Sequence, residues 1–273
     1  MAPDRATARH HPPLGEASAT EGGSGDEAVS DAGTATPGAT EGFKRAAAEA
    51  AAALIEDGMR VGLGTGSTVA YLLPALAERG LRGLRCAATS PATERAARAL
   101  GLIVEDLDAL GELDIAIDGA DQVEEAGWLV KGGGAAQTRE KIVAAAARRF
   151  VVIVSAEKAL VALRPPVPLE LLRFGVGRTL SEVGEARLRR APRGAAEDPV
   201  GSRDALESPD GNLIADYFGP IGDPAELAAR LSATPGVVEH GLFAPEMVSC
   251  VLVAGAAGVE RREGAKHDPE NPG

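Results

Sequence analysis

Four charged side chains within residues 118–141 could carry out proton chemistry. Asp118 and Asp121 lie three residues apart in DIAIDGAD, at the end of an apolar run that predicts a buried strand. Lys131 precedes three glycines, and Glu140 follows in the first turn of an alanine-rich predicted helix. Two neighbouring carboxylates raise the pKa of one of them, as proton transfer near neutral pH requires. The stretch therefore predicts an acid–base centre beside a lysine.

Each of these side chains also has a simpler structural explanation. An isolated Asp-Gly-x-Asp more often forms a turn whose side chains bond their own backbone. Glu140 at a helix start complements the helix dipole, which lowers its pKa. A catalytic Glu140 would therefore need burial or a bound anion to restore its basicity. Lys158, after FVVIVSAE, is by itself typical of a solvated surface lysine.

Two glycine-rich segments could bind the negatively charged part of a ligand. GLGTGST, residues 62–68, lies between a predicted strand and a predicted helix, where backbone N–H groups and the Ser67 and Thr68 hydroxyls can bind phosphate. It is neither GxGxxG nor Walker A, because Ser67 takes the third glycine position and the lysine is missing. A glycine turn with a Ser/Thr helix cap explains the segment equally well. In KGGG, Gly132, Gly133 and Gly134 can form an anion-binding nest.

Taken together, these features suit a small phosphorylated polyhydroxy substrate, with no organic cofactor and no metal. The histidines are scattered, and Cys86 and Cys250 lack both metal-ligand spacing and the density of a disulfide framework. A carboxylate could move a proton between adjacent carbons. The lysine and backbone N–H groups could then stabilise the negative oxygen that forms.

The elements that must position these residues alternate from Phe43 onward. Strands are predicted at 60–64, 84–90, 102–106, 113–120, 150–155 and 249–255, and helices at 43–57, 67–80, 91–101 and 138–150. This alternation predicts an α/β fold with a Rossmann-like parallel sheet and helices on both faces. Pro74 predicts a kink or an early end in its helix.

Changes in composition divide the chain into segments. A smaller α+β domain is expected where proline-rich sequence begins, with a hairpin turn at Asp210-Gly211 and a helix capped by Asp223. The first segment is acidic and poor in large apolar side chains, which predicts disorder. The expected boundaries are a disordered acidic tail at 1–42, an α/β catalytic domain at 43–164 and 236–259, the small domain at 165–235, and a flexible C-terminal tail at 260–273.

Bulk properties exclude several classes of protein. The 273 residues carry a net charge of −12 and show no basic face, which argues against nucleic-acid binding. No apolar run approaches the roughly 18 residues that cross a bilayer. The start of the sequence lacks a secretory signal pattern, so a cytoplasmic protein without a membrane partner is expected.

Several motifs, in order along the chain, closely resemble ribose-5-phosphate isomerase of type A. They are GLGTGSTV, TSPATERAARALG, DIAIDGADQV, KGGGAAQTREKIV, VVIVSAEK, PVPLEL and PGVVEHGLF. The resemblance covers about Phe43 to Val259, and DGAD, KGGGA and TREK at these separations are highly specific. It implies interconversion of D-ribose 5-phosphate and D-ribulose 5-phosphate in the non-oxidative pentose phosphate pathway, through a cis-enediolate and without a metal.

The resemblance also implies roles for individual residues. Glu140 matches the general base that moves a proton between C1 and C2, and Asp118 matches a residue that assists ring opening and hydroxyl proton transfer. Asp121 and Lys131 match residues that orient and polarise the reacting oxygens. The matching substrate-binding positions are Thr65, Gly66, Ser67, Thr68, Asp118, Gly119, Ala120, Asp121, Lys131, Gly132, Gly133, Gly134 and Lys158. Family members are dimers or tetramers, so a homodimer or homotetramer is expected.

Two departures and two alternatives accompany this resemblance. Gln122 stands where an acid often follows DGAD, and SPDGN differs from the usual lead-in of the small-domain hairpin. Amino-sugar phosphate deaminases and CoA transferases share the fold family, but they would need other catalytic residues. A non-catalytic sugar-phosphate sensor would be expected to carry a basic helix-turn-helix segment, which the sequence lacks.

Overall fold

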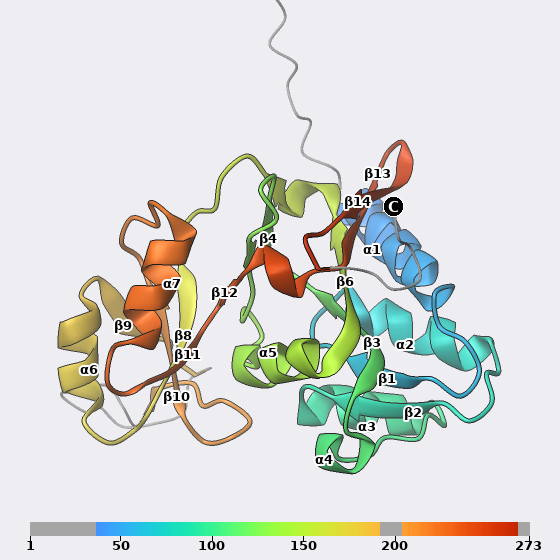
Figure 1. Cartoon of the computed structure of the whole chain (residues 1–273), viewed down its shortest axis with the longest axis horizontal. Helices are drawn as coiled ribbons and strands as arrows, with labels where there is room; N and C mark the ends of the chain where they lie inside the picture. Colours follow the sequence, from blue (N-terminus) through green and yellow to red (C-terminus); the bar gives the residue numbers. More distant parts are fainter. Residues whose placement is uncertain (1–36, 192–203, 267–273) are drawn as a thin grey trace, which may run out of the picture. The chain divides into compact units, whose positions relative to one another are not determined.

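The computed structural model describes residues 37–191 and 204–266 (Figure 1). Its largest sheet has six strands in the order β14-β13-β6-β3-β1-β2, and all neighbours are parallel except β13 and β14. The strands are β1 (Arg60–Leu63), β2 (Arg85–Ala88), β3 (Leu113–Gly119), β6 (Ala147–Ser155), β13 (Cys250–Gly255) and β14 (Gly258–Glu263). This is the predicted Rossmann-like parallel sheet, with one antiparallel strand added at its edge.

Helices cover both faces of this sheet. They are α1 (Pro37–Ala52), α2 (Val69–Glu78), α3 (Pro91–Ala99), the short α4 (Leu107–Leu110) and α5 (Gln137–Ala146). Ile117 and Ile153 share a core cluster with α1 and α2, whereas Ala116 and Val152 share another with α5. Because successive strand residues point to opposite faces, α1 and α2 lie on one side of the sheet and α5 on the other.

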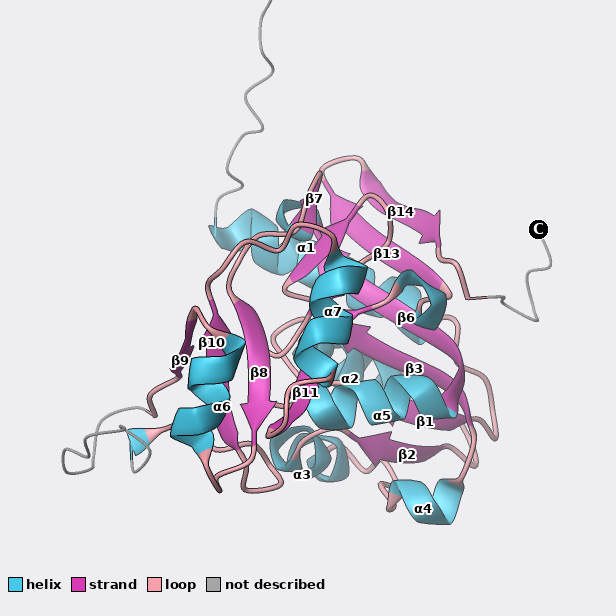
Figure 2. Cartoon of the chain, turned by 60° about the vertical axis from the view of Figure 1, so that its left-hand side comes forward, coloured by secondary structure: helices cyan, strands magenta, loops and turns pink. Residues whose placement is uncertain are grey.

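Two smaller sheets complete the described part of the chain. An antiparallel sheet has the order β11-β8-β10-β9, and a mixed sheet has the order β12-β5-β4-β7. The first contains β8 (Val167–Leu171), β9 (Ala186–Leu188), β10 (Leu213–Tyr217) and β11 (Val237–His240), and it accompanies α6 (Val176–Val183) and α7 (Pro224–Ser232) (Figure 2). The second contains β4 (Gln122–Glu124), β5 (Leu129–Val130), β7 (Ala159–Leu160) and β12 (Leu242–Phe243). Single 3₁₀ turns lie at Ala156–Lys158 (η1) and Pro245–Met247 (η3).

The small antiparallel sheet agrees with the α+β segment expected near 165–235. Asp223 caps α7 as predicted, accepting hydrogen bonds from the backbone N–H groups of Ala225 and Glu226. The turn at Asp210-Gly211 also forms, with Gly211 at a positive φ of 81°. Its two arms are joined only by an isolated bridge, since β10 pairs with β8 and β9 instead. That this segment is a separate domain remains a prediction.

The ends of the expected segments differ from the structure. Helix α1 begins at Pro37, inside the region assigned to the tail. Proline suits the first turn of a helix, and Glu41 in the next turn forms a 2.7 Å ion pair with Lys44 and accepts a hydrogen bond from the Tyr71 hydroxyl. Residues 260–263, assigned to the C-terminal tail, continue β14 because they pair with β13. The rest of the two expected tails, 1–36 and 267–273, lies outside the described residues.

Three predicted elements of the α/β domain, one strand and two helices, also differ from the structure. Residues 102–106 form only a single bridge, between Val104 and Cys86, and Ile103 is 57% exposed. Helix α2 does not end at Pro74 but continues to Glu78. The carbonyl that Pro74 cannot bond belongs to the exposed Ala70, where water can replace the missing N–H. Helix α5 ends at Ala146, because Ala147 already pairs with β3. None of the described helices is long and apolar enough to cross a membrane.

Candidate active site

A cavity opens at the carboxyl ends of β1, β3 and β6. The chain passes from β1 to β2 on one side and then returns to β3 on the other side of β1, so the strand order reverses here. Ligands of open parallel sheets bind at such switch points. The cavity is lined by Lys44, Thr65, Gly66, Ser67, Thr68, Gly119, Ala120, Asp121, Lys131, Gly132, Gly133, Gly134, Glu140, Ser155 and Lys158.

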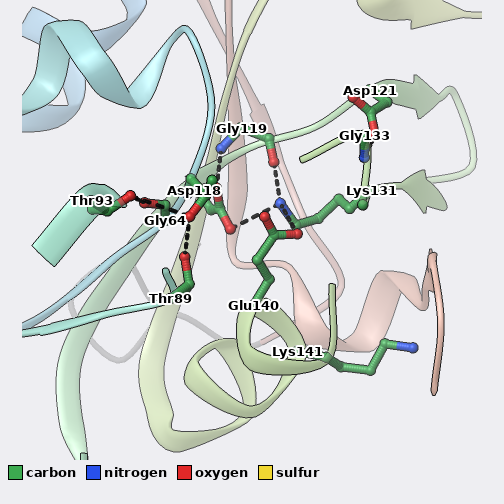
Figure 3. Close-up of polar contacts among 12 residues, drawn as sticks. Gly64, Thr89, Thr93, Asp118, Gly119, Asp121, Lys131, Gly133, Glu140 and Lys141 are labelled. Carbon is green, nitrogen blue, oxygen red and sulfur yellow. Dashed lines mark hydrogen bonds and ion pairs between the residues drawn. The ribbon is translucent and has the colours of Figure 1, made fainter. Parts of the chain in front are cut away.

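The centre of the site is a buried group of two carboxylates and one lysine. The Lys131 ammonium nitrogen lies 2.9 Å from Asp118 Oδ2 and 3.2 Å from Glu140 Oε2 (Figure 3). All three side chains are no more than 3% exposed. Lys131 also donates a hydrogen bond to the carbonyl oxygen of Gly119. The lysine therefore links the end of β3 to the first turn of α5.

Backbone groups fix Asp118 at this junction. Its Oδ1 accepts hydrogen bonds from the Thr65 N–H at 3.0 Å and from the Gly119 N–H at 2.7 Å. A Cβ atom on Gly64 would lie 2.0 Å from the Asp118 carboxylate, so only glycine allows β1 and β3 to approach in this way. The Asp-Gly turn expected as the simpler explanation does not form, because Asp118 and Gly119 end strand β3; Asp118 does bond the neighbouring Gly119 N–H, but it also bonds Thr65 across the switch point.

Burial gives this group unusual pKa values. Burial raises the pKa of Glu140 to about 8, and the negative charge of Asp118 adds to this effect while Lys131 opposes it. Burial likewise raises the pKa of Asp118. The pKa of Lys131 rises to about 12, because two carboxylates outweigh the burial that would lower it. The dipole of α5 thus does not prevent Glu140 from being basic near neutral pH.

The second predicted aspartate, Asp121, lies between β3 and β4 and is hydrogen-bonded to the glycine loop. Asp121 Oδ2 accepts a 2.7 Å hydrogen bond from the Gly133 N–H, and the Asp121 N–H donates to the Val130 carbonyl at 2.8 Å. A Cβ atom on Gly133 would lie 2.6 Å from Asp121 Oδ1, which explains a glycine at that position. Asp121 lines the cavity beside the buried group and is held there by the glycine loop.

The loop after β1 presents hydroxyl groups to the same cavity. Thr65 Oγ1 lies 2.8 Å from Thr89 Oγ1, which ties the loops after β1 and β2 together. Thr68 precedes α2, but its side chain makes no capping hydrogen bond. The helix therefore does not use the Thr68 hydroxyl, contrary to the alternative that this segment is only a capped turn.

The structure brings the predicted site residues together. Every predicted substrate-binding residue lines the cavity except Asp118, which is 2% exposed and lies behind Lys131. Sequence reasoning missed two lining residues, Lys44 and Ser155. Ser155 ends the predicted strand FVVIVS and could have been found from that position. Lys44 belongs to no local motif, and only the packing of α1 brings it to the cavity.

The chain resembles known proteins over most of its length. The sequence model described as "Ribose 5-phosphate isomerase A (phosphoriboisomerase A)" matches residues 85–258. The protein named ribose-5-phosphate isomerase A from Caulobacter vibrioides is 44% identical over 229 residues, covering 80% of this chain and 96% of its own. The one from Methylorubrum extorquens is 47% identical over 220 residues, covering 78% and 92%.

Solved structures give the same result. Ribose 5-phosphate isomerase A from Methanocaldococcus jannaschii matches with a TM-score of 0.75 and 34% identity, covering 82% of this chain and 99% of that one. A D-ribose-5-phosphate isomerase in complex with phospho-erythronic acid matches equally well, with a TM-score of 0.75 and 34% identity. The sequence and the fold agree with these matches, and the chain belongs to the ribose 5-phosphate isomerase A family.

Proposed function

We propose that Glu140 is the base with which this isomerase interconverts D-ribose 5-phosphate and D-ribulose 5-phosphate. The observation that carries the proposal is the buried contact of Glu140 with Lys131, beside a cavity at the switch point of the sheet. A carboxylate with a pKa of about 8 is a strong enough base to remove a carbon-bound proton and can return it afterwards.

The reaction divides into two proton transfers on the open-chain sugar. Ionised Glu140 takes the proton from C2 of the aldose, and the electrons of that C–H bond move toward O1 to give a cis-enediolate. Lys131 and backbone N–H groups of the glycine loop stabilise the negative oxygen. Glu140 then returns the proton to C1, while the hydroxyl proton moves from O2 to O1 and Asp121 orients these two oxygens. The product is the ketose, with atoms and charge conserved.

Asp118 acts behind this reacting centre. The assignment of Asp118 to ring opening rests on the family resemblance, and its contact with the cavity passes through Lys131 at 2.9 Å. Its negative charge also helps to raise the pKa of Glu140. Asp118 therefore supports both the orientation of Lys131 and the basicity of Glu140.

The phosphate belongs at the other end of the cavity in this proposal. Thr65 to Thr68 lie at the amino end of α2, where N–H groups and the helix dipole favour an anion. Lys44 and Lys158 add positive charge to the cavity lining. This arrangement leaves the reacting carbons facing the glycine loop and Glu140.

We also propose a homodimer or homotetramer in the cytoplasm. The oligomer follows from the family resemblance, and the buried thiol of Cys86 suits a reducing compartment. Sedimentation of the purified chain at several concentrations would test the assembly, and a monomer throughout would contradict it.

The test of the proposed function is an assay of the full chain on ribose 5-phosphate. The wild type should form ribulose 5-phosphate, and Glu140→Gln should lower kcat by at least about 10²–10⁴-fold while substrate binding by calorimetry persists. Glu182→Gln, which removes an exposed carboxylate paired with Arg178 on α6, is the matched control. A wild type that forms no ketose would reject the isomerase, and a normal kcat in Glu140→Gln would remove Glu140 from its role.

A further inference from the structure

Arg189, directly after β9, reaches from the small antiparallel sheet to the glycine loop of the site. Its Nη1 donates to the carbonyl of Gly132 at 3.0 Å and to the carbonyl of Gly133 at 3.1 Å. Its Nε and Nη2 bind the two oxygens of Asp216 on β10, the first at 2.9 Å. The guanidinium is thus anchored at one edge and bonded to the loop at the other.

These contacts determine which way the loop's N–H groups point. In a trans peptide the C=O and the following N–H point in opposite directions. With the Gly132 carbonyl held by Arg189, the Gly133 N–H points to the other side, where it donates to Asp121 at 2.7 Å. With the Gly133 carbonyl held in the same way, the Gly134 N–H also points away from Arg189, and Gly134 lines the cavity.

The loop needs such a restraint because its own sequence provides little. Three consecutive glycines have a wide range of backbone conformations, and Gly132 adopts a positive φ of 103°. The remaining backbone bond within the turn runs from the Ala135 N–H to the Gly132 carbonyl, which Arg189 shares. The positive charge also polarises both peptide groups, which makes their N–H groups better donors to an anion.

We propose that Arg189 is a positioning residue for the isomerisation, because it orients the Gly134 N–H toward the enediolate oxygen and Asp121 toward the substrate hydroxyls. Arg189 does not line the cavity and acts only through the loop. This inference rests on the proposed function. Arg189 binds both Asp216 oxygens through Nε and Nη2 while Nη1 reaches the loop, and this combination requires the planar fork of a guanidinium, which lysine cannot reproduce.

The experiment compares Arg189→Gln and Arg189→Lys with wild type in the full-length chain. A matched control is Arg190→Gln, because Arg190 is the next residue and its side chain is 76% exposed. The readouts are kcat and KM for ribose 5-phosphate, the inhibition constant of 4-phosphoerythronate, and the thermal midpoint. The carboxylate of that inhibitor is planar and negative like the enediolate, and its phosphate is shared with the substrate, so a larger change in its inhibition constant than in KM reports on the loop's donors rather than on phosphate binding.

For Arg189→Gln we expect kcat to fall about 10–100-fold, since misplacing one oxyanion donor costs about that much or more. The inhibition constant should rise by a similar factor, while KM changes less than about threefold because both variants keep the phosphate site. Arg189→Lys should recover only a small part of the loss, and Arg190→Gln should match wild type. Asp216→Asn, which loosens the anchor but keeps the guanidinium, should reproduce the same pattern more weakly and remains informative if Arg189→Gln folds poorly.

Two results would overturn the inference. One is an unchanged kcat and inhibition constant in Arg189→Gln and Asp216→Asn. The other is a uniform weakening of substrate and inhibitor in step with a lower thermal midpoint, which would make Arg189 a structural anchor only. An inactive wild type would instead reject the proposed function. The two failures can be told apart because the wild-type assay alone tests the function, whereas the variants test the role of Arg189.

Discussion

Two buried lysines, Lys131 and Lys141, approach the same aromatic ring in different electrostatic surroundings. Their ammonium nitrogens lie 5.5 Å and 4.8 Å from the ring centroid of Phe243. Lys131 contacts two buried carboxylates, and its pKa rises to about 12. Lys141 contacts one carboxylate, Glu239 at 2.7 Å, and burial lowers its pKa. The number of carboxylates around each lysine thus decides the direction of the shift.

This difference in charge distinguishes two contacts made by neighbouring residues of α5: the reactive contact of Glu140 with Lys131 and the structural contact of Lys141 with Glu239. Glu140 and Lys141 are adjacent on α5, so their side chains leave it about 100° apart, and Figure 3 shows Lys141 pointing away from Lys131. Beside the cavity the negative charge exceeds the positive, which leaves Glu140 able to take up a proton. Lys141 instead pairs with one carboxylate, Glu239, which is 25% exposed. The arrangement beside the cavity therefore gives Glu140 a pKa near neutral pH, where it can exchange a proton.

Removing each lysine in turn gives the largest expected difference. Lys131→Met leaves two buried carboxylates without a counter-charge, so we expect a loss of about 3–5 kcal/mol in the free energy of unfolding, together with loss of isomerase activity. Lys141→Met leaves a carboxylate that water can reach, so we expect a loss of only about 1 kcal/mol and a kcat near that of wild type. Urea unfolding and steady-state kinetics on both variants make the comparison. A Lys131→Met protein as stable as Lys141→Met would show that the buried group is not held together by charge.

The dependence of stability and activity on pH gives the next largest effect. The pKa of Glu140 is about 8 in the folded chain, above the 4.5 of an unperturbed glutamate. The folded state therefore binds this proton more tightly, and its stability falls as the pH rises from about 4.5 through 8. The Glu140→Gln variant should lack that decline, as urea unfolding between pH 5 and 9 would reveal. In the wild type, kcat/KM should increase toward pH 8 as the base ionises.

A flat pH profile would contradict this assignment. If kcat/KM were constant from pH 6 to 9, Glu140 would have to be ionised throughout. Lys131 would then lower the pKa of Glu140 by more than burial raises it. The surroundings of Lys131 and Lys141 would not differ in the way described.

Residues within local motifs could be predicted from the sequence, and residues brought in by packing could not. Asp118, Lys131 and Glu140 were predicted because each lies at the end of a strand or the start of a helix with a recognisable pattern. Arg189 directly follows β9, and Lys44 lies on α1. The sequence around each of them resembles that around ordinary surface residues. Their positions depend on tertiary contacts, namely the pairing of Arg189 with Asp216 and the packing of α1 beside β6.

The same distinction explains the errors in secondary structure. The run at 102–106 has strand-forming residues, but its only pairing is at Val104. The helix expected to reach Phe150 stops at Ala146, because the sheet takes the following residues. Local propensity does not include the competition between a helix and a strand for one segment. The lengths of elements therefore depended on the sheet, while their order and type followed from the sequence.

The smallest expected effect concerns His240, which lies beside the structural lysine Lys141. Burial and the nearby Lys141 lower the pKa of His240 to about 4, while Glu239 opposes this shift. Its Nε2 lies 3.1 Å from Ser232 Oγ, and its Nδ1 accepts from the Leu242 N–H at 3.2 Å, so the ring is held in its neutral form. Because the unfolded chain binds this proton more tightly, stability should fall as the pH drops from about 6.5 to 4. That slope is opposite in sign to the one expected from Glu140.

His240→Asn tests this opposite slope. Asparagine can still accept the Leu242 hydrogen bond through its side-chain oxygen, but it does not titrate. We expect kcat to change less than about twofold and the stability loss between pH 6.5 and 4 to shrink, measured by urea unfolding against wild type. The Glu140→Gln variant is the control, since it should keep the acid-side loss and remove the alkaline-side loss. The two pH ranges overlap between about 4.5 and 6.5, so the sign of each change decides the test. If both substitutions changed the slope of stability against pH in the same direction, Glu140 and His240 would titrate as one cluster, and the separation between reactive and structural lysines would be wrong.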